Sequence, residues 1–315
     1  MPSSQQADGL MRQGISPSKL YLPKLAQTVP TIFAYLCQKF PHITPDEWRG
    51  RFEQGLVLHE GKVLTQDSPY QHGLTISYYR QLACETIVPF AHRIICENDE
   101  LLVVDKPHFL TVAPAGRYVQ QTLLTRLKAQ TGNANISPVH RLDRETAGVI
   151  LFAKTPKART TYQKLFANHA IDKCYHAIAP ASEQHHFPLS LALPLERGEP
   201  FYTMKVGQGE PNTHTLIEPL QISRDGKWCK YQLRPTTGKL HQLRVHMNYL
   251  GLAICHDSFY PVVRHRADDD FSKPLQLLAK RLSFVDPITG EMMRFESEFE
   301  LDLENFSSDK SADGL

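Results

Sequence analysis

Several patterns that would assign a protein to a class at once are missing from this sequence. Its 315 residues include six cysteines, but none of them forms a CxxC pair, so neither a zinc knuckle nor a thiol redox motif is predicted. No segment approaches the roughly 18 consecutive apolar residues of a membrane span. The polar first residues also lack the apolar run of a secretion signal. We therefore expect a cytoplasmic protein, where scattered cysteines stay reduced.

A strong excess of charge of either sign is also missing. The chain has 35 Lys and Arg against 33 Asp and Glu, a formal net charge of +2. Such a balance neither requires nor excludes a nucleic-acid partner, and any positive surface must be local. Apolar residues make up 41%, which is ordinary for a globular protein with a hydrophobic core. The length suggests about two domains.

The chain divides by pattern into two domains with unstructured ends. Polar composition predicts disorder in residues 1–18 and in the tail 305–315. Between them we expect a small domain over 19–82, a linker over 83–92 and a larger domain over 93–304.

Two helices and a set of short strands are predicted in the small domain. Apolar residues at helical spacing cover 32–40, and Thr44-Pro45-Asp46-Glu47 is a capping-box start for a second helix that ends near Gly55. Residues 56–58 and 62–64 flank a glycine turn as in a hairpin, and a further strand follows near 74–78.

The larger domain shows many short strands and few helices. Residues 94–96 and 101–104 flank a turn-rich tetrad as in a hairpin, and an apolar stripe predicts a helix over 158–169. Strands and helices do not alternate as in a doubly wound fold, and no glycine-rich phosphate loop follows a strand. We therefore predict an α+β fold with a mixed sheet.

The most polar short segment precedes an apolar strand. PVHRLDRETAGVILFAKT (138–155) places Asp143 between two arginines, directly before the strand Val149–Ala153. A carboxylate in a loop that a buried strand holds is a rigid and accessible nucleophile. On its own, an Asp between two arginines is more often a solvated ion pair, worth under about 1 kcal/mol, than a catalyst. It is no kinase catalytic loop, because the chain has no DFG and no upstream glycine-rich loop.

The same segment resembles the HRLD-x-x-T-S-G signature of the RluA-type pseudouridine synthases, with Ala147 in place of serine. Further blocks resemble that family in the right order. They are LLVVDKPHFLTVAP (101–114), KCYHAIAP (173–180), TGKLHQLRVHMNYLGLAICHDSFY (237–260) and LLAKRLSFVDP (277–287). Together they cover about two-thirds of the chain.

The departures from the family blocks concern positions beside the motif residues. His108-Phe109 replaces Ala-Gly, Lys239-Leu240 replaces Arg-Thr, His256 replaces Gly and Leu278 replaces His. None of them removes the carboxylate, the tyrosine or the arginine of HQLR, so they bear on substrate identity more than on reaction type.

The resemblance implies a pseudouridine synthase fold, with a central mixed, largely antiparallel sheet flanked by helices. It also implies isomerisation of uridine to pseudouridine in structured RNA, with rRNA favoured and tRNA as an alternative. No atoms are gained or lost in this reaction, so no redox cofactor is expected, and the resemblance implies no metal. We expect a monomer without a membrane or protein partner.

The small domain resembles an RNA-binding domain first known from a ribosomal protein, which precedes the catalytic domain in many of these enzymes. The likeness depends on two helices followed by GLVLHEGKVL and further strands. Its charges nearly cancel, so a helical cap without RNA contact is the alternative.

Three residues are expected to be catalytic by the resemblance. Asp143 is the nucleophile, Arg244 keeps that carboxylate charged and can bind both of its oxygens, and Tyr175 stacks on the uracil. Leu240, Leu243, Met247 and Leu250 form a helical stripe, which places His241 and Arg244 together on another helix face. Whether Asp143 attacks the sugar carbon, the base, or the C2′ proton stays open.

Six more residues are expected to bind the substrate. Leu277 forms an apolar wall, and His140 and Arg141 act as phosphate or scaffold contacts. The remaining three are polar: Lys173, Lys239 and His241.

Two other functions compete with this interpretation. One is a non-catalytic RNA-binding or RNA-folding factor on the same fold, which intact Asp143, Tyr175 and Arg244 disfavour. The other is a metal-dependent hydrolase, which the histidine spacing disfavours, since His241 and His246 are five residues apart rather than four.

Overall fold

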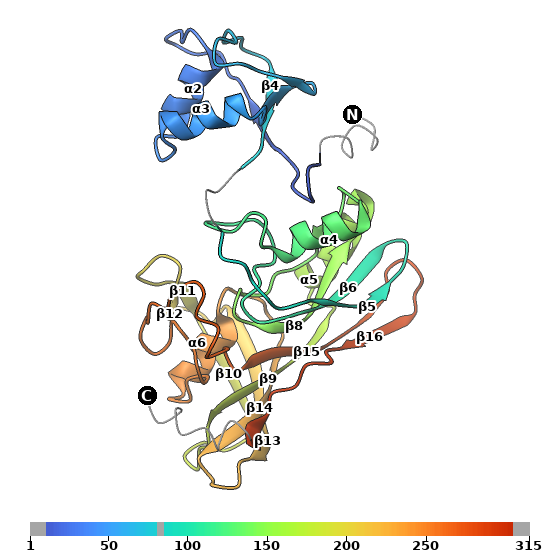
Figure 1. Ribbon diagram of the computed structural model, residues 1–315. Helices are drawn as coiled ribbons and strands as arrows, with labels where there is room; N and C mark the ends of the chain where they lie inside the picture. Colours follow the sequence, from blue (N-terminus) through green and yellow to red (C-terminus); the bar gives the residue numbers. More distant parts are fainter. Residues whose placement is uncertain (1–10, 81–84, 305–315) are drawn as a thin grey trace. The chain divides into compact units, whose positions relative to one another are not determined.

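A computed structural model describes residues 11–80 and 85–304 (Figure 1). It divides into two compact units. The first comprises Met1–Glu85 and Pro114–Ala134, and the second Thr86–Ala113 and Asn135–Leu315. Residues 114–134, which the sequence analysis assigned to the larger domain, thus group with the first unit. The expected disorder of residues 1–10 and 305–315 concerns segments outside the described residues.

The first unit contains the elements predicted for the small domain. Helices α2 (Ile32–Lys39) and α3 (Pro45–Glu53) precede the hairpin of β2 (Val57–His59) and β3 (Lys62–Val63), and β4 (Thr75–Tyr78) follows. The strands form a sheet in the order β1-β4-β2-β3. The core between helices and sheet is built from aliphatic and aromatic side chains: Leu22, Ile32, Tyr35, Leu36, Trp48, Phe52, Val57 and Ile76.

The predicted capping box at the start of α3 is confirmed. The Thr44 hydroxyl accepts from the Glu47 backbone N–H at 3.2 Å, and the Glu47 carboxylate accepts from the Thr44 N–H at 2.8 Å. Pro45 occupies the first turn, where no intrahelical N–H is needed. Local chemistry therefore fixes this helix boundary.

Strand β1 (Ser18–Tyr21) begins inside the segment 1–18, for which the sequence predicted no structure. The residues before it are held by contacts far along the chain. The Arg12 guanidinium lies 4.8 Å from the Tyr79 ring, and the Lys128 ammonium donates to the Ser16 hydroxyl at 2.9 Å. Lys128 belongs to α4 (Leu123–Thr131) of the same unit. No local pattern in a polar segment reveals such tertiary contacts.

The second unit is built on a ten-stranded sheet. Its main path runs β10-β13-β14-β9-β15-β8-β6-β5, while β16 pairs with β15 and β7 with β8. Only the β15–β8 pair is parallel among the pairs that the structure describes, so the predicted mixed, largely antiparallel sheet is confirmed. The strands are β5 (Arg93–Glu97), β6 (Leu101–Lys106), β7 (Ser137–Pro138), β8 (Ala147–Ala153), β9 (Asp172–Pro180), β10 (Leu189–Leu193), β13 (Thr213–Ile222), β14 (Trp228–Pro235), β15 (Leu277–Val285) and β16 (Met292–Glu296).

Beside this sheet, the described residues of the unit include two labelled helices and a separate hairpin. Helix α5 (Pro156–Ala167) buries Ala158 and Tyr162 in a core with residues of β6, β8 and β15. Helix α6 (Gln242–Tyr249) buries Leu243 and Met247 in a second core with residues of β9, β13 and β14. The hairpin pairs β11 (Leu195–Arg197) with β12 (Met204–Val206). The helix predicted over 158–169 therefore exists, although it begins and ends two residues earlier.

The loop with Asp143 connects β7 to β8, which pair antiparallel. Every residue of β8 is buried, so the loop is anchored at its C-terminal end by a strand in the protein interior. Gly148 allows β8 to approach β15, because its φ is +112° and an added Cβ would lie 2.2 Å from the carbonyl oxygen of Ala279. This close approach explains the glycine of the HRLD block in physical terms.

No helix within residues 11–80 and 85–304 is long and apolar enough to cross a membrane, and the longest has 12 residues.

Candidate active site

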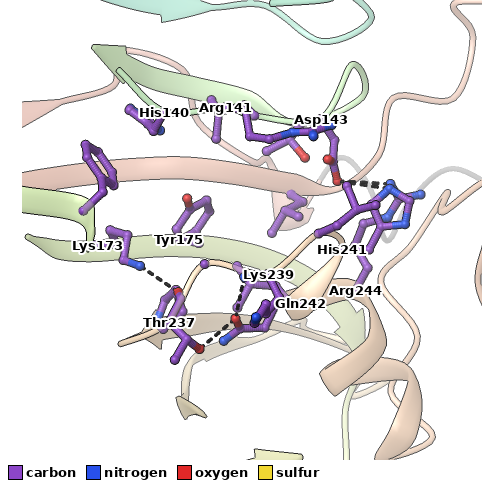
Figure 2. Close-up of a pocket in the computed structure, with 18 of the residues that line it drawn as sticks. His140, Arg141, Asp143, Lys173, Tyr175, Thr237, Lys239, His241, Gln242 and Arg244 are labelled. Carbon is purple, nitrogen blue, oxygen red and sulfur yellow. Dashed lines mark hydrogen bonds and ion pairs between the residues drawn. The ribbon is translucent and has the colours of Figure 1, made fainter. Parts of the chain in front are cut away.

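One cavity of about 640 Å³ in the second unit collects all nine residues that the sequence selected (Figure 2). They come from the β7–β8 loop, from β9, from the segment before α6, from α6 itself and from the start of β15. The nine are His140, Arg141, Asp143, Lys173, Tyr175, Lys239, His241, Arg244 and Leu277. The volume lies within the range of roughly 300–1,000 Å³ typical of small-molecule sites.

Asp143 lies at the edge of this cavity with 19% of its side chain exposed. Its Oδ2 atom is 3.3 Å from Nη1 of Arg244 and 3.7 Å from Nε2 of His241. In Figure 2 the carboxylate points toward both side chains. The predicted pairing of Asp143 with Arg244 is thus present in the structure.

Most of the hydrogen bonds of the Arg244 side chain go to a different carboxylate, that of Asp257. Its Nε and Nη2 atoms donate to the two oxygens of Asp257 at 2.7 and 2.6 Å. Nη2 also lies 3.3 Å from Glu145, and only Nη1 faces Asp143. The expectation that Arg244 binds both oxygens of Asp143 is therefore wrong, because the bidentate partner is Asp257.

The guanidinium of Arg244 is 2% exposed and lies among three carboxylates. Burial alone would lower the pKa of Arg244, but the hydrogen bonds and charge of Asp257, with those of Asp143 and Glu145, raise it overall. The Phe259 ring centroid is 4.9 Å from the guanidinium carbon, which adds a cation–π contact. The arginine is thus permanently charged and held from several sides.

His241 does not share a helix face with Arg244, contrary to the sequence expectation. Helix α6 begins at Gln242, and His241 is its N-cap with a left-handed backbone (φ +52°). The imidazole still lines the cavity and is only 8% exposed. A helical stripe cannot reveal a left-handed residue at the helix start, and this explains the error.

Tyr175 and Leu277 form part of the apolar wall. In the register of β9 and β15, Tyr175 opposes Ala279 and Ala177 opposes Leu277, so the two side chains lie on the same face of the sheet. Burial, followed by the nearby charge of Asp143, raises the pKa of the Tyr175 phenol. The tyrosine is therefore a neutral ring at the cavity surface.

The segment before α6 is held by Gln242 and Lys173. The Lys173 ammonium donates to the Thr237 carbonyl at 2.7 Å, and the Thr237 hydroxyl donates to the Gln242 side-chain oxygen at 2.8 Å. That oxygen also accepts from the Lys239 backbone N–H at 3.1 Å. Burial lowers the pKa of Lys173 to about 8. These contacts fix the loop and leave the Lys239 side chain exposed.

His140 is committed to the scaffold of the β7–β8 loop. Its Nε2 accepts from the Leu151 backbone N–H at 3.1 Å, and its ring stacks on Phe166 with a centroid distance of 4.4 Å. Burial lowers the pKa of His140 to about 3, so the ring carries no charge near neutral pH. Arg141 beside it is exposed. Of the two roles considered for this pair, the scaffold role fits His140 and the phosphate role fits Arg141.

Sequence reasoning missed four side chains that build the site. They are Glu145, Gln242, Asp257 and Tyr260, which contact Arg244, the loop before α6, or His241. All four lie inside the blocks that carried the family resemblance, which was the available signal. No spacing rule gave them a role: the partners of Glu145, Asp257 and Tyr260 lie 13 or more residues away, and Gln242 bonds to the irregular segment before α6.

Within residues 11–80 and 85–304, no group of three or more His, Cys, Asp or Glu side chains is arranged to hold a metal ion. Three carboxylates of the site, Asp143, Glu145 and Asp257, instead share ion pairs with Arg244.

Comparison with known families gives one description for this region. Residues 100–249 match the family described as RNA pseudouridylate synthase. The match contains Asp143, Tyr175 and Arg244 and ends before Asp257 and Leu277.

Individual relatives give the same description. The chain is 30% identical over 227 residues to ribosomal large subunit pseudouridine synthase D of Zymomonas mobilis, covering 67% of this chain and 70% of that protein. It is 32% identical over 173 residues to the mitochondrial tRNA pseudouridine(32) synthase of Saccharomyces cerevisiae, covering 53% of this chain and 37% of that protein. Among solved structures, human RNA pseudouridylate synthase domain containing 1 superposes with a TM-score of 0.54 at 22% identity, covering 69% of this chain and 86% of that one. This last likeness establishes the fold.

Proposed function

The chain belongs to the RNA pseudouridylate synthase family, and from that premise we propose that Asp143 is the carboxylate with which this enzyme isomerises uridine in RNA. One observation carries the proposal. Asp143 Oδ2 lies 3.3 Å from the buried guanidinium of Arg244, at a cavity that Tyr175 and Leu277 also line.

The reaction requires a group that reacts with the nucleoside and is released again. The bond from N1 to the ribose C1′ breaks, the uracil turns, and C5 bonds to the same carbon. C5 loses its proton and N1, which carries none in uridine, gains one, so the overall composition is unchanged. A carboxylate can add to the sugar carbon, add to the base, or remove the C2′ proton, and it can leave again in each case.

The cavity has features that suit attack on a uridine by the Asp143 carboxylate. A uridine in structured RNA must be turned out of its stack to reach Asp143. Stacking of the uracil on Tyr175, worth about 1–3 kcal/mol for a base on an aromatic ring, offsets part of that cost. Leu277 closes the apolar side, and Arg244 places a fixed positive charge 3.3 Å from the partly buried carboxylate of Asp143.

The exposed cations at the cavity suit the RNA backbone. We assign phosphate contacts to Arg141 and Lys239, whose side chains are exposed at the cavity lining. Lys173 and His140 are assigned to the support of the two loops that carry these cations, since both are engaged with backbone groups.

We favour ribosomal RNA as the substrate and keep tRNA as the alternative. The relative from Zymomonas mobilis is named for the large ribosomal subunit, and the yeast relative for a tRNA position. The first unit, which contains helices α2, α3 and α4 and a four-stranded sheet, is proposed to contact the same RNA.

We also propose that the enzyme acts as a cytoplasmic monomer without a metal or organic cofactor. The cysteines Cys37, Cys96, Cys174, Cys229 and Cys255 are free thiols, as in a reducing compartment. Light scattering after gel filtration tests the monomer, and activity after chelation tests the metal.

Release of tritium from RNA labelled at uridine C5 tests the function, because every route removes the C5 proton. We expect release by the wild-type protein from ribosomal RNA of a strain that lacks this enzyme, and none by Asp143→Asn. Asp99→Asn, an exposed change in the turn between β5 and β6, is the matched control and retains release.

Two results would count against the proposal. Turnover by folded Asp143→Asn would remove the nucleophile assignment. Binding of RNA by the wild type without tritium release from rRNA or tRNA would favour the non-catalytic RNA-binding alternative. Mapping of pseudouridines across all RNAs of the deletion strain identifies the target.

A further inference from the structure

His241 has a strained backbone at a position that normally requires a different residue. Its φ of +52° lies in the left-handed region, which costs a non-glycine residue about 1–2 kcal/mol. As the N-cap of α6 it makes no side-chain capping bond, which Ser, Thr, Asp or Asn would provide. The imidazole is nevertheless buried. Strain without a capping role indicates that the ring is needed where it lies.

The hydrogen bonds around Tyr260 determine which nitrogen of His241 carries the proton. The Met204 backbone N–H, at the start of β12, donates to the Tyr260 hydroxyl oxygen at 2.8 Å. The His241 Nδ1 atom lies 3.0 Å from the same oxygen. Within the described residues, Nδ1 is the acceptor that this buried hydroxyl proton can reach. Tyr260 therefore donates to Nδ1, which must be unprotonated.

Burial raises the pKa of Tyr260 to about 12, so its hydroxyl keeps the proton that it donates. Burial also lowers the pKa of His241 to about 4, although Asp143 and Asp257 oppose this effect while Arg244 and Arg141 reinforce it. The ring is therefore neutral near pH 7. A neutral ring with a bare Nδ1 has its proton on Nε2, the atom 3.7 Å from Asp143 Oδ2.

We propose that His241 is a positioning residue for Asp143: a neutral imidazole, held by Tyr260 and Met204, that directs its Nε2–H at Oδ2 of the carboxylate. This inference rests on the proposed role of Asp143. Arg244 Nη1 and His241 Nε2 both approach Oδ2, so the same geometry assigns Oδ1 as the oxygen that reacts.

The arrangement gives Asp143 a second N–H group without a second full charge. Arg244 already divides its charge among three carboxylates and offers Asp143 a single nitrogen. A second cation would weaken the carboxylate as a nucleophile, whereas a neutral N–H orients it. The separation of 3.7 Å is longer than a hydrogen bond, and we expect it to shorten to one when substrate fills the cavity.

NMR of the full-length protein with ¹⁵N-labelled histidine tests the tautomer without any RNA. The resonances of His241 are assigned by their loss in His241→Gln. We expect a protonated Nε2 and a bare Nδ1 at pH 7, and a shift toward the other tautomer in Tyr260→Phe. A protonated Nδ1, or a doubly protonated ring, in the wild type would overturn the proposal whatever the activity is.

Two substitutions of similar size separate a positioning role from a structural one. In His241→Gln the side-chain amide N–H can occupy the place of Nε2–H, while the amide of His241→Asn reaches only the place of Nδ1. We expect kcat within about 10-fold of wild type for Gln and a loss of about 100-fold for Asn, with KM nearly unchanged in both. Equal loss in the two variants, or a loss confined to KM, contradicts the role.

The effect of Tyr260→Phe depends on the residue at position 241. In the wild-type background it should lower kcat about 10-fold, because Nδ1 loses its donor. In the His241→Gln background it should have no further effect, because glutamine has no tautomer to select. If the losses of kcat from the two substitutions add in the double variant, Tyr260 has a packing role and does not act through His241. Wild-type protein without tritium release would instead refute the proposed function and leave the NMR result valid.

Discussion

Arg244 and Asp257 form a bidentate ion pair, with Nε and Nη2 of the arginine 2.7 and 2.6 Å from the two carboxylate oxygens. Asp257 is itself fixed, because its Oδ1 accepts the backbone N–H groups of Phe259 and Tyr260 at 2.8 and 3.1 Å. The arginine is thus oriented by the segment after α6 before it meets Asp143. Its third nitrogen, Nη1, is the one presented to the proposed nucleophile.

Asp257→Asn should lower both stability and activity. The amide keeps the shape of the carboxylate but loses its charge, so a buried guanidinium is left with weaker partners. We expect a loss of about 3 kcal/mol in the free energy of unfolding, measured in urea, and a fall in tritium release because Arg244 turns. Asp269→Asn, on an exposed residue, is the control and should match the wild type. Unchanged stability of Asp257→Asn would refute this account of the pair.

Arg244→Lys should also lower both stability and activity, although the positive charge is kept. A single ammonium cannot bind both oxygens of Asp257 and reach Asp143 at the same time. We expect a destabilisation of about 1–3 kcal/mol and a loss of tritium release of at least about 100-fold. Arg294→Lys replaces an arginine that is 62% exposed and pairs with Glu296, and it should have little effect. Activity near the wild-type level in Arg244→Lys would show that charge alone suffices.

The sequence predicted the elements whose causes are local. The capping box at Thr44 and Glu47, the glycine turn between β2 and β3, and the buried strand after Asp143 depend on neighbours within a few residues. The placement of the nine selected residues in one cavity was also predictable, because all nine lie in four of the blocks that resemble the family.

The contacts between those blocks were not predictable from spacing. Asp143 and Arg244 are separated by 101 positions, and Glu145 and Ser258, whose side chains hydrogen bond at 2.6 Å, by 113. The sheet and the turn after α6 determine which carboxylate accepts the two hydrogen bonds from Nε and Nη2 of Arg244. The left-handed backbone of His241 follows from the same packing, and no propensity of histidine indicates it.

Two departures from the family blocks, Phe109 and His256, stand where glycine is usual and keep a left-handed backbone, with φ of +64° and +61°. Phe109 is 2% exposed, and its ring centroid lies 6.0 and 5.2 Å from those of Phe90 and Phe271. His256 is half-buried, and its Nδ1 lies 3.2 Å from the Pro274 carbonyl oxygen. The buried ring contacts of Phe109 offset its backbone strain, while at His256 the hydrogen bond to the Pro274 carbonyl contributes.

Replacement by glycine should have different consequences at these two positions. Relief of strain contributes about 1–2 kcal/mol at each. Loss of a buried phenylalanine side chain costs about 3–5 kcal/mol, so Phe109→Gly should be destabilised by about 1–4 kcal/mol. His256→Gly should lie within about 1 kcal/mol of wild type, since relief of strain offsets the loss of the hydrogen bond to the Pro274 carbonyl. Urea unfolding of both variants measures the difference, and equal effects would show that the aromatic contacts of Phe109 contribute little.

His246 is a fully buried histidine whose hydrogen bond fixes its protonation. The Thr213 hydroxyl donates to the Leu193 carbonyl at 2.6 Å, so its oxygen must accept from His246 Nε2, 2.8 Å away. Burial, followed by the charge of His214, lowers the pKa of His246 to about 4, against about 6.5 in the unfolded chain. The pKa of His241 and that of His108 are also lowered by burial to about 4.

Stability should therefore fall as the pH drops from about 6.5 toward 4. In that interval the unfolded chain binds protons on these histidines and the folded chain does not, so acid favours unfolding. Above pH 6.5 the contribution is constant, and each histidine accounts for at most about 3 kcal/mol at the acid end. We expect the free energy of unfolding in urea to decrease steadily between pH 7 and 4.5. His246→Gln, which keeps an N–H for Thr213 and has no titrating group, should lose less over the same range. Parallel pH profiles for the variant and the wild type would mean that His246 titrates alike in both states, and the assignment of its buried, neutral form would then be wrong.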